Sequence, residues 1–187
     1  MNRLMLLDEN ELLQGAQRWD LDALGKIYDA YSPGLYRYAW RLLGDVQLAE
    51  DCVSVTFERF LQALQNGRGP RNHLQAYLYR IAHNWVTDHY RKKQPTTISL
   101  EDHELEDDHP LPETCVNTRQ QQEMVRNALN QLPPDQGLVM SLKYLEGWES
   151  EQIASALERS IGAVKALQHR ATAALRKKIE FSETAHE

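Results

Sequence analysis

Apolar residues recur at spacings of three and four along the first half of this chain, which is the period of an amphipathic helix. Asp20 can accept hydrogen bonds from the first turn of one such helix. We expect Pro33 and Gly34 to kink or break that helix, because proline removes a backbone donor. A loop rich in glycine and asparagine follows the third helix. After a short first helix, the pattern predicts helices over residues 20–44, 45–64 and 72–93.

The second half of the chain is again helical. One predicted helix ends near Gln131, before Pro133 and Pro134, and another ends at Gly147. A short helix over residues 149–157 and a longer one over 161–180 follow a tight turn. Few stretches alternate with the period of a strand, so we predict an all-α fold. Two small helical domains, 1–94 and 119–187, are expected on either side of a flexible acidic linker over 95–118.

The net charge of −6 argues at first against a nucleic-acid partner. Residues 1–94 carry 12 basic and 11 acidic side chains, and residues 119–187 carry nine of each. Residues 95–118 carry seven acidic side chains and no Lys or Arg. The acidity is therefore concentrated in the expected linker, and the total charge says little about what either domain binds.

The short helix, the turn and the long helix near the C-terminus form the pattern of a helix-turn-helix. Ser160 is a good N-cap for the second helix, and Val164, Leu167 and Ala171 lie at spacings that pack inward. Small and basic residues are left on the outer face, where they fit a DNA groove. An ordinary helical hairpin with a solvated basic face would show the same pattern. The candidate DNA-binding residues are Ser160, Gly162, Lys165, Ala166, His169 and Arg170.

A second candidate surface lies on the helix over residues 72–93, where aromatic side chains alternate with basic ones. Basic residues neutralise phosphates and aromatic rings stack on unpaired bases. Most of the aromatic residues are explained equally well as core. A separate polar face, with spacings of four, four and three, is not explained by core packing. It consists of Arg80, Asn84, Asp88 and Arg91.

The helix over residues 45–64 has a broad apolar side and a polar side. The polar side fits a docking surface for a partner helix, or simply a solvated helix face. Its candidate residues are Glu50, Asp51, Ser54 and Glu58.

No enzyme motif is found in the sequence, which contains no phosphate-binding glycine loop, no HExxH and no GxSxG. Cys52 and Cys115 lie far apart, and the histidines do not combine with them into a metal site, so we expect reduced thiols, no metal and no cofactor. No segment is apolar enough to insert into a membrane, and the N-terminus lacks a signal-peptide pattern. These features predict a cytoplasmic protein without catalytic activity.

Several stretches resemble sigma factors of the extracytoplasmic-function (ECF) type, which belong to the sigma-70 family. Residues 35–45, 49–57 and 77–84 with Asp88 are similar to region 2 of those proteins. Residues 132–134, 144–147, 152–154 and 162–171 are similar to region 4. The two regions follow in the family's order, over about residues 20–180.

This resemblance implies a subunit that binds core RNA polymerase and directs it to promoter DNA. The helix 45–64 would bind the polymerase. The loop over residues 66–72 and the helix through Asn84 and Arg91 would open and read the −10 element, and the helix from Ser160 would read the −35 element. An anti-sigma factor is an expected further partner. The chain departs from the family at Glu158, where glycine is common, at Arg159, where an apolar residue is common, and at Val55, where an acidic residue is common.

Two other interpretations stay open from the sequence alone. A helix-turn-helix regulator that acts without core polymerase would carry the same C-terminal motif. An enzyme with a helical active site is disfavoured, because no pocket motif is present. Binding to core polymerase separates the first alternative from a sigma factor.

Overall fold

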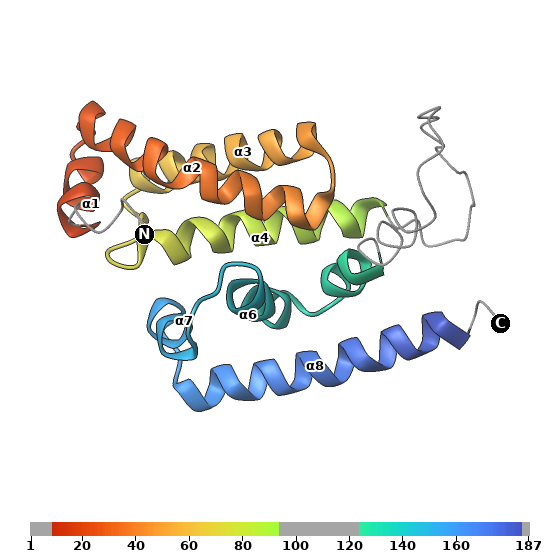
Figure 1. Ribbon diagram of the computed structural model, residues 1–187. Coiled ribbons are helices and arrows are strands. Elements are labelled where there is room, and N and C mark those ends of the chain that lie inside the picture. The colour runs from red at the N-terminus through yellow and green to blue at the C-terminus, as the bar shows by residue number, and fades with distance from the viewer. Residues whose placement is uncertain (1–8, 94–123, 185–187) are drawn as a thin grey trace.

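The computed structural model describes residues 9–93 and 124–184, with side chains up to residues 92 and 177. The first part, here called the N-terminal bundle, folds into helices that pack side by side (Figure 1). Their apolar faces enclose a common core. Tyr38, Phe60 and Leu78 are the centre of that core and are almost completely buried. The bundle consists of α1 (Glu9–Gln17), α2 (Leu21–Leu43), α3 (Val46–Gln65) and α4 (Leu74–Lys93).

The second part, here called the C-terminal bundle, is also helical. It contains a helical stretch over residues 124–130, then α6 (Pro134–Tyr144), α7 (Ser150–Ala156) and α8 (Ile161–Thr184). No strand occurs in either described part of the chain, so the all-α prediction with two helical domains is confirmed. The expected acidic linker, residues 95–118, lies outside the described residues.

Pro33 and Gly34 were expected to kink or break the second helix, and a break is wrong, because α2 continues through both residues. Pro33 lies on the exposed side, where water can bind the carbonyl that a proline leaves without its helical donor. Gly34 has a packing role instead. A Cβ there would lie 2.8 Å from the hydroxyl of Tyr79, so only glycine lets α4 approach so closely.

The start of α4 also differs from the prediction at Asn72. The chain takes a left-handed conformation at His73, and the helix begins at Leu74. The backbone N–H of Leu74 donates to Glu9 Oε1 at 2.7 Å, so a carboxylate from α1 caps this helix. No local pattern around Asn72 could have shown a cap supplied from 65 residues away.

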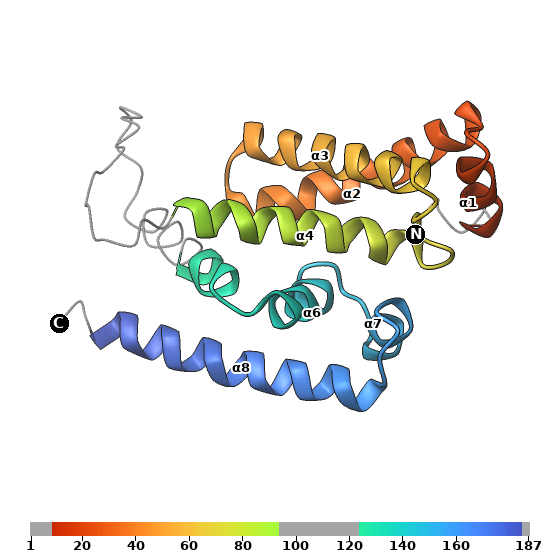
Figure 2. The ribbon, with the colours of Figure 1, turned by 180° about the vertical axis from the view of Figure 1, so that it is seen from behind.

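The two bundles pack against each other in layers. Figures 1 and 2 show α4 between α2 and α3 on one side and α6 and α7 on the other, with α8 as the outermost helix. One hydrophobic core continues from Tyr38 and Leu78 into Val139, Leu142 and Ile153. The described part of the chain is therefore one body, although it is built from two helical domains.

Among the described helices, none combines the length and the apolar character needed to cross a membrane.

Candidate nucleic-acid interface

The helix-turn-helix geometry is set by caps at both of its helices. Glu149 begins α7 with a capping box, in which its backbone N–H donates to Gln152 Oε1 at 2.8 Å. Ser160 begins α8, and its Oγ accepts from the N–H of Ala163 at 3.2 Å, which confirms the predicted N-cap. Between the helices, Glu158 has a φ of 53°, in the left-handed region that favours glycine. The turn between α7 and α8 therefore forms even though Glu158 has a backbone conformation that is strained for a residue with a Cβ.

The inner face of α8 packs as its spacing predicts. Val164, Leu167 and Ala171 are buried against the rest of the C-terminal bundle. The opposite face points away from the body of the protein, and its first three turns combine small and basic side chains. All six candidate residues, Ser160, Gly162, Lys165, Ala166, His169 and Arg170, are exposed there. A groove of duplex DNA could approach this face without displacing any other helix.

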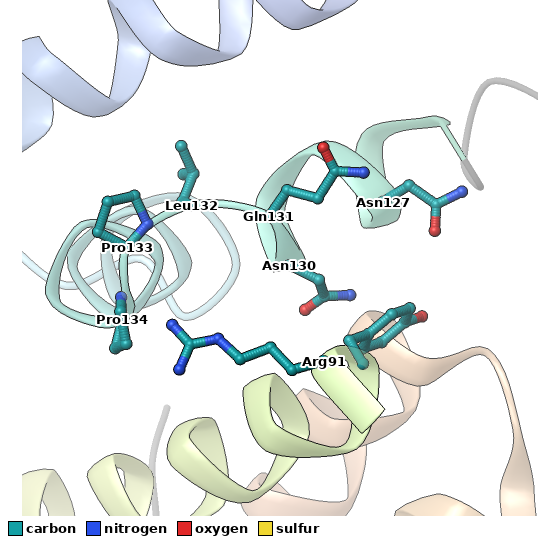
Figure 3. A pocket seen from close by; sticks show the side chains of 8 residues that line it. Arg91, Asn127, Asn130, Gln131, Leu132, Pro133 and Pro134 are labelled. Carbon is teal, nitrogen blue, oxygen red and sulfur yellow. The ribbon is translucent and has the colours of Figure 1, made fainter. Parts of the chain in front are cut away.

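The candidate residues on α4 form an exposed stripe. Arg80, Asn84, Asp88 and Arg91 are all exposed. Arg91 extends along a crevice of about 560 Å³, with Asn130 and Gln131 on the opposite wall (Figure 3). Arg91, one of the candidate DNA-binding residues on α4, therefore lies at the junction with the C-terminal bundle.

The inner face of α4 carries buried polar groups that the sequence pattern did not single out as a contact surface. His83, expected among the basic residues of this helix, is only 3% exposed. Its Nδ1 lies 2.8 Å from the hydroxyl of Tyr38. Burial lowers the pKa of His83 to about 4, while a backbone hydrogen bond to Pro134 and the charge of Asp135 act in the opposite direction. His83 is therefore neutral at pH 7 and contributes no charge toward a phosphate.

Tyr79 on the same inner face donates from its hydroxyl to Glu146 Oε2 at 2.9 Å. Burial and the neighbouring charge of Glu146 raise the pKa of this phenol, so it remains a donor at physiological pH. Tyr90 reaches the end of α2 and donates to the carbonyl of Leu42 at 3.0 Å. These contacts fix α4 between its neighbours.

The candidate docking residues on α3 lie on the side of the N-terminal bundle that the C-terminal bundle leaves free. Glu50, Asp51, Ser54 and Glu58 are exposed. Glu50 and Ser54 line a groove of about 500 Å³ whose other wall is formed by α2, including Tyr28 and Tyr36. The groove combines aromatic surface with carboxylate and hydroxyl groups, which suits a partner helix of mixed character.

No group of three or more His, Cys, Asp or Glu in the described residues is arranged to hold a metal ion. Cys52 is buried, and burial raises the pKa of its thiol to about 12, so it is protonated and unreactive at neutral pH. Cys115 lies outside the described residues.

Comparison with protein families identifies both halves of this arrangement. Residues 27–96 match the family described as Sigma-70 region 2, and residues 122–175 match Sigma-70, region 4. The chain is 30% identical over 177 residues to the ECF RNA polymerase sigma factor SigW of Bacillus subtilis, covering 89% of this chain and 94% of SigW. The chain belongs to the ECF sigma factor family. It directs transcription initiation with RNA polymerase.

Other relatives agree with this assignment. The ECF sigma factor BldN of Streptomyces coelicolor is 32% identical over 170 residues, which cover 88% of this chain and 63% of BldN. The ECF sigma factor SigL of Mycobacterium tuberculosis is 30% identical over 165 residues, covering 88% of this chain and 93% of SigL.

The fold is shared with a solved structure, that of CnrH in complex with the cytosolic domain of CnrY. The TM-score is 0.61 at 22% sequence identity, over 92% of this chain and 97% of that one. This ECF sigma factor thus shares the helical fold of CnrH.

Sequence reasoning missed the residues that join the two bundles. Arg41 on α2 and Glu146 after α6 lie 105 residues apart, and no local period connects them. Two signals in the sequence were available but ambiguous: a glycine inside a helix, Gly137, and a histidine on an apolar face, His83. Both lie where α6 meets α4.

Proposed function

We propose that this sigma factor reads duplex DNA of the −35 element with α8 and melted DNA of the −10 element with the outer stripe of α4. The observation that carries the proposal is the outer face of α8, where all six candidate residues are exposed at the start of a capped helix. A capped N-terminus directs backbone N–H groups toward a phosphate, and Lys165 and Arg170 supply the cationic contacts.

The proposed division of the chain follows the bundles. Residues 1–94 form the part that binds polymerase and the −10 element, residues 95–118 form the linker, and residues 119–187 form the part that binds the −35 element. Polymerase binding is assigned to Glu50, Asp51, Ser54 and Glu58 on α3. Their support is the exposed groove between α2 and α3, which the C-terminal bundle does not cover.

We further propose an anti-sigma factor as a partner that covers the α2–α3 groove and the helix-turn-helix. Exposed apolar side chains such as Tyr28 and Trp40 on α2, 49% and 44% exposed, support a partner surface there. We also propose that the protein acts in the cytoplasm, where polymerase and promoter DNA are found, and that its role is regulatory and not catalytic. Affinity purification from the native cell tests this partner, and recovery of polymerase alone under every growth condition would contradict it.

In-vitro transcription with core polymerase and a genomic template tests the main proposal. We expect new transcripts that require both the protein and core polymerase. Footprinting of duplex DNA by the protein alone, without co-purification of core polymerase, would instead show a regulator that acts independently.

A further inference from the structure

The turn between α1 and α2 presents a tryptophan to solvent. Trp19 is 46% exposed, and its φ of 60° lies in the left-handed region that glycine favours. The N–H of Trp19 donates to the carbonyl of Ala16, and the N–H of Asp20 donates to that of Gly15, both at 3.0 Å. These two bonds make a Schellman motif, in which the left-handed position is usually a glycine. The chain therefore has a large aromatic residue where the backbone favours the smallest one.

The fold holds Trp19 in place without burying it. Asp20 ends the motif and also begins α2, where its carboxylate accepts from the N–H of Asp22 at 3.0 Å. Trp19 belongs to neither hydrophobic cluster of the described residues, so packing of its ring does not offset the backbone strain. Strain that the structure maintains at an exposed side chain is typical of a binding site.

The loop over residues 66–73 lies beside this turn. Figures 1 and 2 show α1 and the loop before α4 at the same end of the N-terminal bundle. Gln17 Nε2 at the end of α1 donates to the carbonyl of Pro70 at 3.3 Å. Trp19 follows Gln17 by two residues, so their Cα atoms are no more than about 7.6 Å apart. The tryptophan is thus a close neighbour of the loop.

The charges near Trp19 suit a nucleic-acid strand. Arg68 and Arg71 lie on either side of Pro70 in the loop, which contains no Asp or Glu, and Arg18 precedes Trp19. All three arginines are exposed. Arginines neutralise phosphates, and an aromatic ring stacks on the face of an unpaired base. A base inside a duplex is already stacked, so this combination favours single-stranded DNA.

The position of the turn also continues the surface of α4. Arg80, the first residue of the exposed stripe on α4, lies six residues after Leu74, or about 9 Å along the helix axis. The loop connects that end of α4 to the turn. A strand bound along the stripe can therefore continue over the loop to Trp19.

We propose that Trp19 is a stacking platform for an unpaired base of the strand displaced at the −10 element. Arg18, Arg68 and Arg71 bind the phosphates on either side of that base. This inference rests on the proposed role of α4 in binding melted DNA, and it extends that role to the α1–α2 turn. The ring acts only after the strands separate, so it stabilises the opened complex and does not contribute to binding of duplex DNA.

Trp19→Gly separates binding from folding. The substitution removes the ring and places at the left-handed position the residue that favours it. Thermal unfolding followed by circular dichroism should therefore occur at the wild-type temperature or above it. Trp19→Phe keeps an aromatic ring. Leu21→Ala is the matched control, because it removes an apolar side chain that is 80% exposed and only two residues away.

The lifetime of the opened complex tests the platform. Holoenzyme is assembled on a promoter recovered by transcription of the genomic template, and decay is followed after heparin is added. Trp19→Gly should shorten the lifetime by about fivefold or more, the loss expected for one stacked base. The loss should also occur on a template mismatched over the −10 element, since the contact is needed after melting. Trp19→Phe should keep most of the lifetime, and Leu21→Ala all of it.

Fluorescence of 2-aminopurine identifies the stacked base. The probe is placed at one position at a time in the displaced strand of the mismatched template. At one position, emission should be quenched by the indole in the wild type and should rise in Trp19→Gly. If no position differs between the two proteins, no base stacks on Trp19 and the proposal is wrong.

The remaining outcomes separate the platform from the proposed function. If the wild type supports no transcription with core polymerase, the proposed function is wrong and this inference fails with it. If the wild type is active and Trp19→Gly gives an equal lifetime, only the platform is wrong. An equal loss in Leu21→Ala and Trp19→Gly would show that the turn is an apolar contact with a protein, which also overturns the proposal.

Discussion

The two helices proposed to read DNA, α4 and α8, differ most in how much of their surface is packed against other helices. α4 is packed on two sides, by α2 and α3 and by α6 and α7, and keeps only a narrow polar stripe exposed. α8 is packed on one side, by α6 and α7, and its outer face is open. The exposed stripe of α4 includes Asp88 as well as Arg80 and Arg91, whereas the open face of α8 carries basic residues without an acidic one over residues 162–170.

This difference suits two kinds of DNA. A major groove about 12 Å wide accepts a whole helix face, and α8 offers one. A single strand needs only a line of hydrogen-bonding groups beside an adaptable loop, and α4 offers that stripe next to residues 66–73. The rigid packing of α4 also fixes its stripe in position while bases are drawn out of the duplex. Replacing residues on the two helices should therefore affect different steps of initiation.

The largest effect is expected on α8. Arg170→Ala should weaken binding of holoenzyme to duplex containing the −35 element by about 1–3 kcal/mol if the side chain contacts bases. If it contacts only a phosphate, the slope of affinity against salt should fall by about one. Lys165→Ala is expected to behave in the same way. Fluorescence-anisotropy titrations over a range of salt concentrations measure both quantities.

Arg176→Ala is the matched control for this prediction. It removes the same charge from an exposed position of the same helix, six residues beyond the last residue of the proposed contact surface. Equal losses for Arg170→Ala and Arg176→Ala would show a general charge effect instead of a defined reading surface.

A smaller and later effect is expected on α4. Asn84→Ala should spare initial binding to duplex and reduce strand opening by on the order of tenfold, because a lost contact to an unpaired base matters only after melting. A template mismatched over the −10 element should partly rescue this variant and should not rescue Arg170→Ala. Permanganate footprinting of the opened bubble and initiation assays on both templates make the comparison.

Gln14→Ala, which removes an exposed amide from α1, controls for a general effect of losing a surface side chain. Equal rescue of Asn84→Ala and Arg170→Ala by the mismatched template would mean that the two helices have been assigned wrongly.

The sequence predicted these helices well because their signals are local. The spacing of Val164, Leu167 and Ala171 is enough to orient α8, and Ser160 caps it as expected. The junction between bundles was not predictable in the same way. Its contacts join α2 and α4 to α6 over long sequence separations, and a helical glycine such as Gly137 has several explanations until its neighbour is known.

The same limit explains the errors at α2 and α4. Pro33 is a strong local signal for a break, but tertiary packing of Tyr31, Leu35 and Tyr38 keeps α2 continuous. The N-cap of α4 comes from Glu9, which is distant in sequence. The reading roles of the exposed residues on α4 and α8 stay predictions, because exposure permits DNA contact without demonstrating it.

The stability of the fold should depend on pH through His83. Above the usual histidine pKa of about 6.5, this side chain is neutral in both the folded and the unfolded chain, so its titration does not change stability. As the pH falls below that value, the unfolded chain takes up a proton, and the folded protein does not until about pH 4. The folded protein therefore loses stability between about pH 6.5 and pH 4, by about 1 kcal/mol at pH 5.5.

The groups facing His83 are Tyr38 from α2 and, from α6, Asp135 and the backbone of Pro134. Tyr38 does not titrate in this range, because burial raises its pKa. Thermal unfolding followed by circular dichroism at pH 7.5 and pH 5.5 measures the change, with His83→Gln as a control that cannot gain the proton. The same change in both proteins would assign the effect to other groups.

The smallest expected effect concerns the turn that positions α8. Glu158 adopts a left-handed φ, which costs a residue with a Cβ about 1–2 kcal/mol relative to its preferred backbone conformations. Glycine avoids that cost but has more conformational freedom to lose on folding, so Glu158→Gly should stabilise the protein by a net amount of at most about 1 kcal/mol. Glu158→Ala keeps the Cβ and should show no such gain. Thermal unfolding followed by circular dichroism compares the two. Because the turn geometry is already formed in the wild type, affinity for −35 duplex should stay unchanged in Glu158→Gly, and a large change would mean that Glu158 itself faces the DNA.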